Sequence, residues 1–120
     1  MPRNRNRRGP VERSGVRRRE QAQVFAALGD QTRLALVMKL ADGHGHSISR
    51  LTRGTRLTRQ AVTKHLRVLE GAGMVRSARA GRESVFEFNP RPLIGLKEYL
   101  DRVSGEWDQA LARLRDLVER

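Results

Sequence analysis

The sequence contains no cysteine, which excludes disulfide bonds, thiolate metal sites and thiol-based redox switching. It also lacks long apolar runs. The longest lie at residues 24–28 and 34–38, far short of the roughly 20 residues that a membrane-spanning helix needs, and neither resembles a secretory signal core. We therefore expect a cytoplasmic protein without a membrane partner.

Aromatic residues are scarce, at 4% of the chain. The core must then be built from Leu, Val, Ala and Ile, and it will be thin for a monomer of 120 residues, so pairing of two chains would stabilise it. Proteins that bind single-stranded nucleic acid depend on aromatic stacking. The scarcity therefore disfavours, without excluding, an RNA-binding function.

Positive charge is abundant and unevenly placed. Lys and Arg number 25 against 13 Asp and Glu, for a formal net charge of +12, and residues 1–19 and 47–82 hold the whole excess. Residues 1–19 are rich in Arg and nearly free of apolar side chains, so we interpret them as a disordered basic arm before a folded domain at 20–120. The arm would either contact DNA or stay a solvated tail.

Helical spacing of apolar residues predicts two helices, at 20–28 and about 31–41, with Asp30 as the cap of the second. The Gly-rich segment 42–46, between the second of these helices and the next one, is interpreted as a flexible loop. The apolar positions that this spacing assigns to the core are Val24, Phe25, Ala27, Leu28, Leu34, Val37, Met38 and Ala41.

A short helix within 47–57, a tight connection and a helix from Thr58 to Gly71 predict a helix-turn-helix, which places its second helix in a DNA major groove. The alternative is an ordinary charged helix face. Arg, Lys, Gln and Thr are side chains that suit base edges and phosphates. The predicted DNA-binding residues of this region are Arg56, Thr58, Arg59, Gln60, Thr63, Lys64 and Arg67.

After Gly73 the apolar period shifts towards two, which predicts a β-hairpin of 74–79 and 83–88 with a basic tip at 80–82. Phe86 and Phe88 share the face expected to pack on the helices. Arg76, Arg79 and Arg82 are expected to contact phosphates or a minor groove, unless they are merely solvated.

The last predicted helix, at about 92–120, carries one continuous apolar seam. A small monomer could cover only its N-terminal part, so we assign the rest to a homodimer interface. The predicted interface residues are Leu96, Tyr99, Leu100, Val103, Trp107, Leu111, Leu114 and Val118.

Three stretches resemble the ArsR/SmtB family of winged helix repressors, and the likeness covers about residues 20–120. They are Phe25 to Arg33, Gln60 to Val75, and the wing from Arg79 to Phe88. The resemblance implies a symmetric dimer on an imperfect palindrome, with repression released by an inducer whose identity stays unknown.

The resemblance also bears on metal binding, because family sensors use cysteines where this chain has Ser47 and Ser49, and histidines on a last helix that has none here. We therefore expect the branch without metal ligands, and no cofactor. His44 and His46 alone are a weak metal signal. For His65 we expect a structural role.

Together these patterns predict a mainly α fold with a small β-hairpin wing, a winged helix-turn-helix that dimerises through its long C-terminal helix. The expected function is sequence-specific binding of double-stranded DNA by a homodimeric repressor. A non-specific nucleoid- or RNA-binding basic protein is the alternative, and a module that recruits a different protein through the last helix is a third interpretation. The sequence has no Gly-rich phosphate loop and no catalytic constellation, so an enzyme is not expected.

Overall fold

The structure is a computed structural model that describes residues 10–119. Over this range the chain forms five helices and three strands. In chain order they are α1 (Pro10–Leu28), α2 (Gln31–Leu40), β1 (His46–Ser47), α3 (Ile48–Thr52), α4 (Arg59–Gly71), β2 (Val75–Ala80), β3 (Glu83–Phe88) and α5 (Arg91–Glu119).

The strands form one antiparallel sheet in the order β1-β3-β2. Ala80 pairs with Glu83, so β2 and β3 are joined by a two-residue turn, and Gly81 adopts the positive φ of 65° that such a turn requires at its first position. The hairpin predicted from the period of two is thereby confirmed, with β2 one residue later than expected.

The helices and the base of the hairpin enclose a single apolar core. Aliphatic residues dominate it, as the low aromatic content predicts, and Phe86 is its one buried aromatic side chain among the described residues. The buried core residues are Val24, Ala27, Leu36, Val37, Leu40, Leu51, Val62, Leu66, Leu69, Met74, Val75, Phe86 and Leu96.

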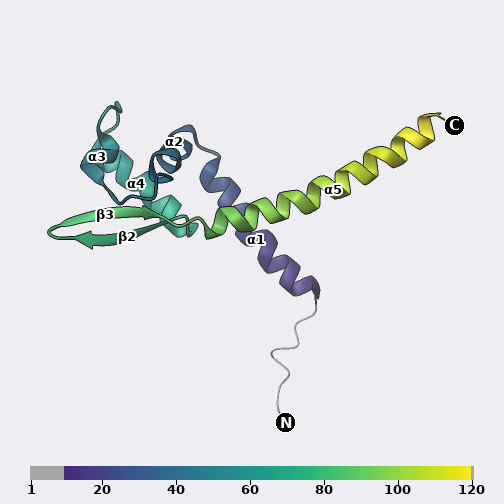
Figure 1. The fold of residues 1–120 in the computed structure, drawn as a ribbon, viewed down its shortest axis with the longest axis horizontal. Helices are drawn as coiled ribbons and strands as arrows, with labels where there is room; N and C mark the ends of the chain where they lie inside the picture. Colours follow the sequence, from purple (N-terminus) through teal and green to yellow (C-terminus); the bar gives the residue numbers. More distant parts are fainter. Residues whose placement is uncertain (1–9, 120) are drawn as a thin grey trace, which may run out of the picture.

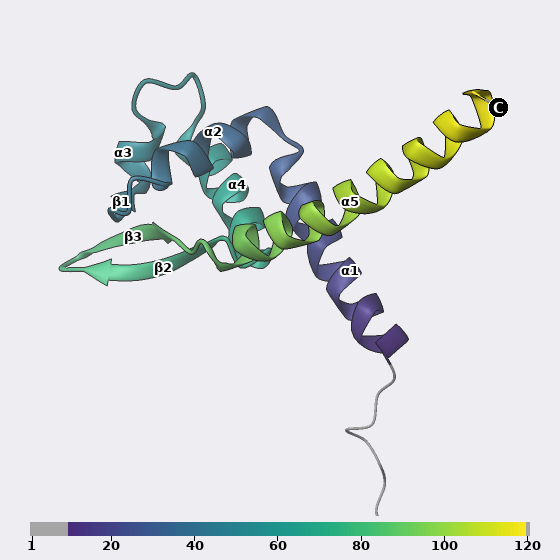
Figure 2. The same ribbon diagram turned by 45° about the vertical axis from the view of Figure 1, so that its right-hand side comes forward.

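Two elements project from this core in opposite directions. The β2–β3 hairpin leaves on one side, and the C-terminal half of α5 leaves on the other (Figures 1 and 2). Helix α1 packs across the beginning of α5 in both views. The hairpin and the end of α5 are therefore both available to partners.

The structure has residues 10–19 in helix α1, which begins at Pro10, whereas the sequence predicts a disordered arm up to residue 19. Proline is tolerated in the first turn of a helix, and the Arg and Glu residues that follow are good helix formers. A helix already nucleated by the packed residues 24–28 extends easily through such a sequence. The expectation for residues 1–9 lies outside the described residues.

The predicted core face of α2 is rotated by about one position. Leu34 and Met38 are 48% and 71% exposed, whereas Leu36 and Leu40 are buried. Both stripes have helical spacing and both include Val37, so periodicity alone could not choose between them. Phe25 on α1 is likewise 44% exposed rather than buried.

The expectation of a flexible loop at 42–46 is wrong for its last residue, His46, which lies in β1. His46 is 7% exposed and pairs with Phe86 in the register of β1 and β3. Its Nε2 lies 3.0 Å from both carboxylate oxygens of Asp42, and because a carboxylate only accepts, Nε2 carries the proton that His46 donates. This histidine therefore closes the loop onto the sheet.

Candidate nucleic-acid interface

Helix α4 starts where its sequence predicts. Thr58 has extended backbone angles, and its hydroxyl accepts a hydrogen bond from the Ala61 backbone N–H at 3.1 Å. This N-cap satisfies one of the free N–H groups at the helix start. The Thr58 hydroxyl is thus already engaged in fixing the first turn of α4.

The two faces of α4 differ sharply in exposure. Val62, Leu66 and Leu69 are fully buried at 0% exposure and fix the rotation of the helix on the core. The opposite face carries Arg59, Gln60, Thr63 and Lys64 near the N-terminus, with Arg67 further along.

Three of these side chains are unpaired. Arg59, Gln60 and Lys64 are exposed, and their side chains make no hydrogen bond or ion pair within the described part of the chain. Thr63 is half-buried, and its hydroxyl donates to the Arg59 carbonyl at 2.7 Å. The first two turns of α4 therefore present two cations and one amide to solvent.

The turn between α3 and α4 is ordered by threonine. The Thr55 hydroxyl donates to the Thr52 carbonyl at 2.6 Å and accepts from the Leu57 backbone N–H at 3.2 Å. Gly54 takes a φ of 82°, which lets the chain reverse there. Arg56 sits in this turn as an exposed cation beside the start of α4.

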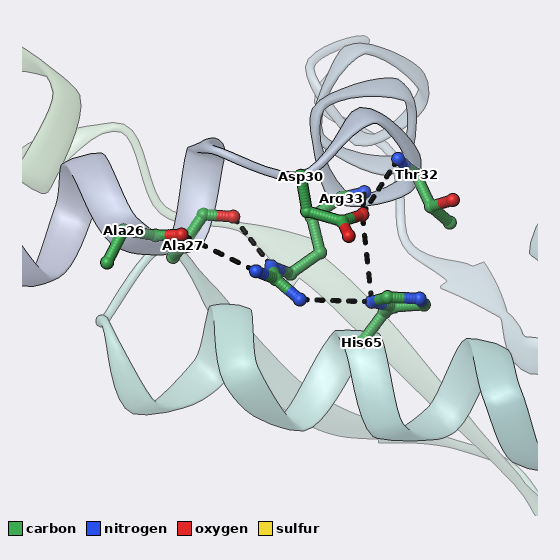
Figure 3. Close-up of polar contacts among 6 residues, drawn as sticks. All are labelled: Ala26, Ala27, Asp30, Thr32, Arg33 and His65. Atoms are coloured by element: carbon green, nitrogen blue, oxygen red, sulfur yellow. Dashed lines mark hydrogen bonds and ion pairs between the residues drawn. The ribbon is translucent and has the colours of Figure 1, made fainter.

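A polar network fixes the middle of α4 against the junction of α1 and α2 (Figure 3). Arg33 donates through Nε to the Ala27 carbonyl at 2.7 Å and through Nη2 to the Ala26 carbonyl at 3.4 Å. Its Nη1 lies 3.2 Å from Nδ1 of His65. Arginine can only donate, so His65 Nδ1 accepts and its proton resides on Nε2.

Asp30 completes this network as the N-cap of α2. Its Oδ1 accepts from the backbone N–H groups of Thr32 at 2.8 Å and of Arg33 at 3.0 Å. The Arg33 N–H, with that of Thr32, holds the pKa of Asp30 below its ordinary value. The distance from Oδ1 to His65 Nδ1 is 4.0 Å, too long for a hydrogen bond, so the predicted structural role of His65 runs through Arg33.

The hairpin adds three exposed arginines. Arg76 stands opposite Glu87 in the strand register, Arg79 stands opposite Ser84, and Arg82 occupies the turn beside Gly81. Arg79 and Arg82 thus form a cationic tip, whereas the charge of Arg76 is partly offset by Glu87.

Arg67 differs from the other cations of α4. Its Nη1 donates to Glu70 Oε1 at 2.7 Å, and Glu70 Oε2 accepts from the Ser77 hydroxyl at 2.9 Å. The pKa of Glu70 is lowered first by Arg67 and then by Ser77. The Arg67 guanidinium also lies 5.7 Å from the centre of the Phe86 ring. Arg67 therefore already has interaction partners within the protein.

The apolar seam of α5 is largely exposed. Leu96 is 6% exposed and belongs to the core of its own chain, so it has little surface to offer the dimer interface that the sequence predicts for it. Tyr99 and Val103 are half-buried. Two exposed apolar side chains of α5, Ile94 and Leu117, are not among the predicted interface residues. The exposed apolar side chains of α5 are Ile94, Leu100, Trp107, Leu111, Leu114, Leu117 and Val118.

Known proteins resemble this arrangement over most of its length. Residues 30–77, from the cap of α2 to Ser77, match the model of the family described as bacterial regulatory protein, arsR family. The HTH-type transcriptional regulator Rv2034 of Mycobacterium tuberculosis is 35% identical over 97 residues, covering 81% of this chain and 87% of the relative. The chain belongs to the ArsR family.

Solved structures agree with this ArsR-family assignment. The ArsR-like transcriptional regulator from Rhodococcus sp. RHA1 superposes with a TM-score of 0.71 at 36% identity, covering 82% of this chain and 92% of that one. The homodimeric winged helix-turn-helix DNA-binding domain Mb0332 of Mycobacterium bovis shares the fold, with a TM-score of 0.64 at 21% identity over 82% and 91% of the two chains. The predicted mainly α, winged helix-turn-helix fold is confirmed, and the ArsR-family chain is a DNA-binding transcriptional regulator rather than an enzyme.

Within residues 10–119 of this ArsR-family chain, no three His, Asp or Glu side chains gather as a metal site would require. Asp42 and His46 form a pair of such residues, and they bond to each other. None of the helices described for residues 10–119 is both long and apolar enough to span a bilayer.

Proposed function

We propose that this ArsR-family chain is a homodimeric repressor that binds a palindromic operator in double-stranded DNA with sequence specificity. One observation carries the proposal: the exposed N-terminal half of α4 presents Arg59, Gln60 and Lys64 without protein partners, on a helix whose opposite face is fully buried. If these side chains had a structural role, they would bond to other groups of the protein.

The chemistry of these three side chains fits base edges in a major groove. Arg and Lys pair with guanine O6 and N7, and Gln pairs with adenine N6 and N7. The buried stripe of α4 and the Arg33–His65 bond fix the helix, so its side chains would meet the groove with little rearrangement. Thr58 caps the start of the helix and Thr63 lies on its second turn, and the hydroxyls of both are already bonded to the helix backbone.

Cations around α4 would contact the DNA backbone. Arg56 precedes the helix, and Arg79 and Arg82 extend from the wing, where they would reach phosphates or the minor groove beside the major groove. Arg76 has a smaller expected share, since Glu87 stands opposite it. The basic segment at residues 1–19 would add charge without base preference.

Exposed apolar side chains on α5 support the homodimer. Trp107, Leu111 and Leu114 are each more than half exposed in a single chain and lie along one seam, which water contacts unless a second copy covers it. The Mycobacterium bovis domain of the same fold is homodimeric, which supports the same arrangement here. A two-fold dimer presents two α4 helices, and such a dimer matches a palindrome with half-sites about one helical turn apart.

A dimer of this kind would act in the cytoplasm, where chromosomal DNA lies, and would repress by occupying promoter DNA. Selection of duplexes from a random pool tests the proposal, because it reports preference, symmetry and half-site spacing together. An enriched palindrome bound by two copies of the chain is the expected result. Equal binding of all duplexes at moderate salt would instead support a non-specific nucleoid protein. Preferential binding of RNA would support an RNA-binding protein.

A further inference from the structure

Helix α4 carries a single carboxylate, Glu70, on a surface that otherwise gathers positive charge. A carboxylate there weakens the attraction of the surface for phosphates. The lowered pKa of Glu70 keeps it ionised at neutral pH, so the unfavourable charge is present under ordinary conditions.

Glu70 joins two elements that would both contact DNA. One carboxylate oxygen accepts from Arg67 on α4 at 2.7 Å, and the other accepts from the Ser77 hydroxyl on β2 at 2.9 Å. Ser77 is the strand partner of Phe86, whose ring also lies under the Arg67 guanidinium at 5.7 Å. The four side chains thus connect the recognition helix to the middle of the wing.

We propose that Arg67, Glu70 and Ser77 are positioning residues that set the angle of the wing relative to α4, and that Arg67 acts through the wing rather than on bases. The proposal rests on the proposed DNA-binding function and adds a device that sets the geometry of its two contact elements.

The position of this link explains why it matters for the wing. Beyond Ser77, residues 79–84 of the hairpin are all exposed, and among the described residues none of their side chains bonds to the helices. The tip lies about 13 Å beyond Ser77 at about 3.3 Å per residue, so a tilt of about 10° would shift it by about 2 Å. A shift of that size at the tip separates Arg82 from a phosphate.

Charge and positioning predict opposite results for Glu70→Gln. Removing a negative charge beside DNA strengthens binding if electrostatics alone acts. Loss of the link weakens binding of the selected duplex, by roughly three- to tenfold for a coupled network of this kind. Glu83→Gln is the matched control, because Glu83 is an exposed wing carboxylate without a side-chain bond in the described structure. It should strengthen binding to every duplex.

The experiment compares wild type with Glu70→Gln, Ser77→Ala, Arg67→Ala and the Arg67/Glu70 double variant. Affinity is measured for a duplex that wild type selects from a random pool and for its scrambled version, over a range of KCl. Hydrogen–deuterium exchange of residues 78–84 is measured in the free protein. We expect each single variant to weaken binding of the selected duplex and to increase wing exchange, and the double variant to be no weaker than Arg67→Ala.

Two results would overturn the proposal. One is Glu70→Gln strengthening binding as Glu83→Gln does. The other is Arg67→Ala lowering the salt slope by about one, as a lost phosphate contact would, while Glu70→Gln and Ser77→Ala change nothing. If wild type selects no duplex, the proposed function fails, whereas the exchange measurement still decides whether this link holds the wing.

Discussion

The guanidinium of Arg33 on α2 lies 3.2 Å from the imidazole of His65 on α4, although 32 residues separate them in the chain. Arg33 also binds the last carbonyls of α1, so a single side chain holds three helices together (Figure 3). His65 is on the half-buried flank of α4, between the buried stripe and the exposed face. The bond therefore sets the orientation of the helix proposed to bind DNA.

Arg33→Ala should destabilise the fold, because it leaves the Ala27 carbonyl oxygen and the His65 Nδ1 without their donor. We expect a loss of about 1–3 kcal/mol in the free energy of unfolding, measured by urea denaturation. Arg50→Ala is the control, since Arg50 is an exposed cation on α3, and it should change stability by less than about 0.5 kcal/mol. Equal effects of the two variants would show that the Arg33 bonds contribute nothing.

Asp30 predicts an acid-dependent loss of stability. Its folded pKa lies below the ordinary value, so ionised Asp30 stabilises the fold above that value, about 3.9, and the contribution disappears as pH falls through the folded pKa. Asp30→Asn keeps a capping oxygen but removes the charge. We expect the variant to melt at a lower temperature than wild type at pH 7 and the difference to shrink below about pH 4. A difference that is constant with pH would contradict this.

Lys64→Ala and Arg59→Ala test the proposed base contacts. Each should weaken binding of the selected duplex by about 1–3 kcal/mol and relax the preference at one position of each half-site, because a base-edge contact is lost. Lys97→Ala on α5 removes the same charge away from α4 and serves as the control. If both α4 variants keep the wild-type preference, the recognition surface lies elsewhere.

Replacing Arg79 and Arg82 together with alanine tests the wing. Phosphate contacts carry no base information, so we expect selected and scrambled duplexes to lose similar affinity. The slope of log affinity against log salt should fall by about two, one for each arginine. A variant that loses affinity only for the selected duplex would indicate that the wing reads sequence.

Trp107→Asp tests the dimer. A charge in the exposed seam of α5 should separate two chains that bury this residue, and DNA affinity should fall with dimerisation. Gln109→Asp adds the same charge on the opposite face of α5 and should leave the dimer intact. Sedimentation of both variants at micromolar concentration measures the result. A wild-type chain that is itself monomeric would refute the homodimer.

Much of this protein was determined by local sequence. Thr58 as a cap, Gly81 in a tight turn and the period of two in 83–88 each act over a few residues. The bounds of α4 and, to within one residue, those of the hairpin could therefore be predicted. The charge on the outer face of α4 follows in the same way, because Val62, Leu66 and Leu69 occupy the other side. The resemblance to the ArsR family rested on these segments and on the stretch from Phe25 to Arg33.

Other features of the fold and the site depended on how the helices and strands pack on one another. The choice of Leu36 and Leu40 over Leu34 and Met38 came from how α2 packs against its neighbours, because a helical repeat permits either stripe. Three further features depend on contacts between different elements or turns. They are the burial of His46, the bonds of Glu70 to Arg67 and Ser77, and the bond from Arg33 to His65. Local propensity fixes where helices and strands begin and end. The packing of one element on another decides which side chains make contacts within the chain and which stay free for a partner.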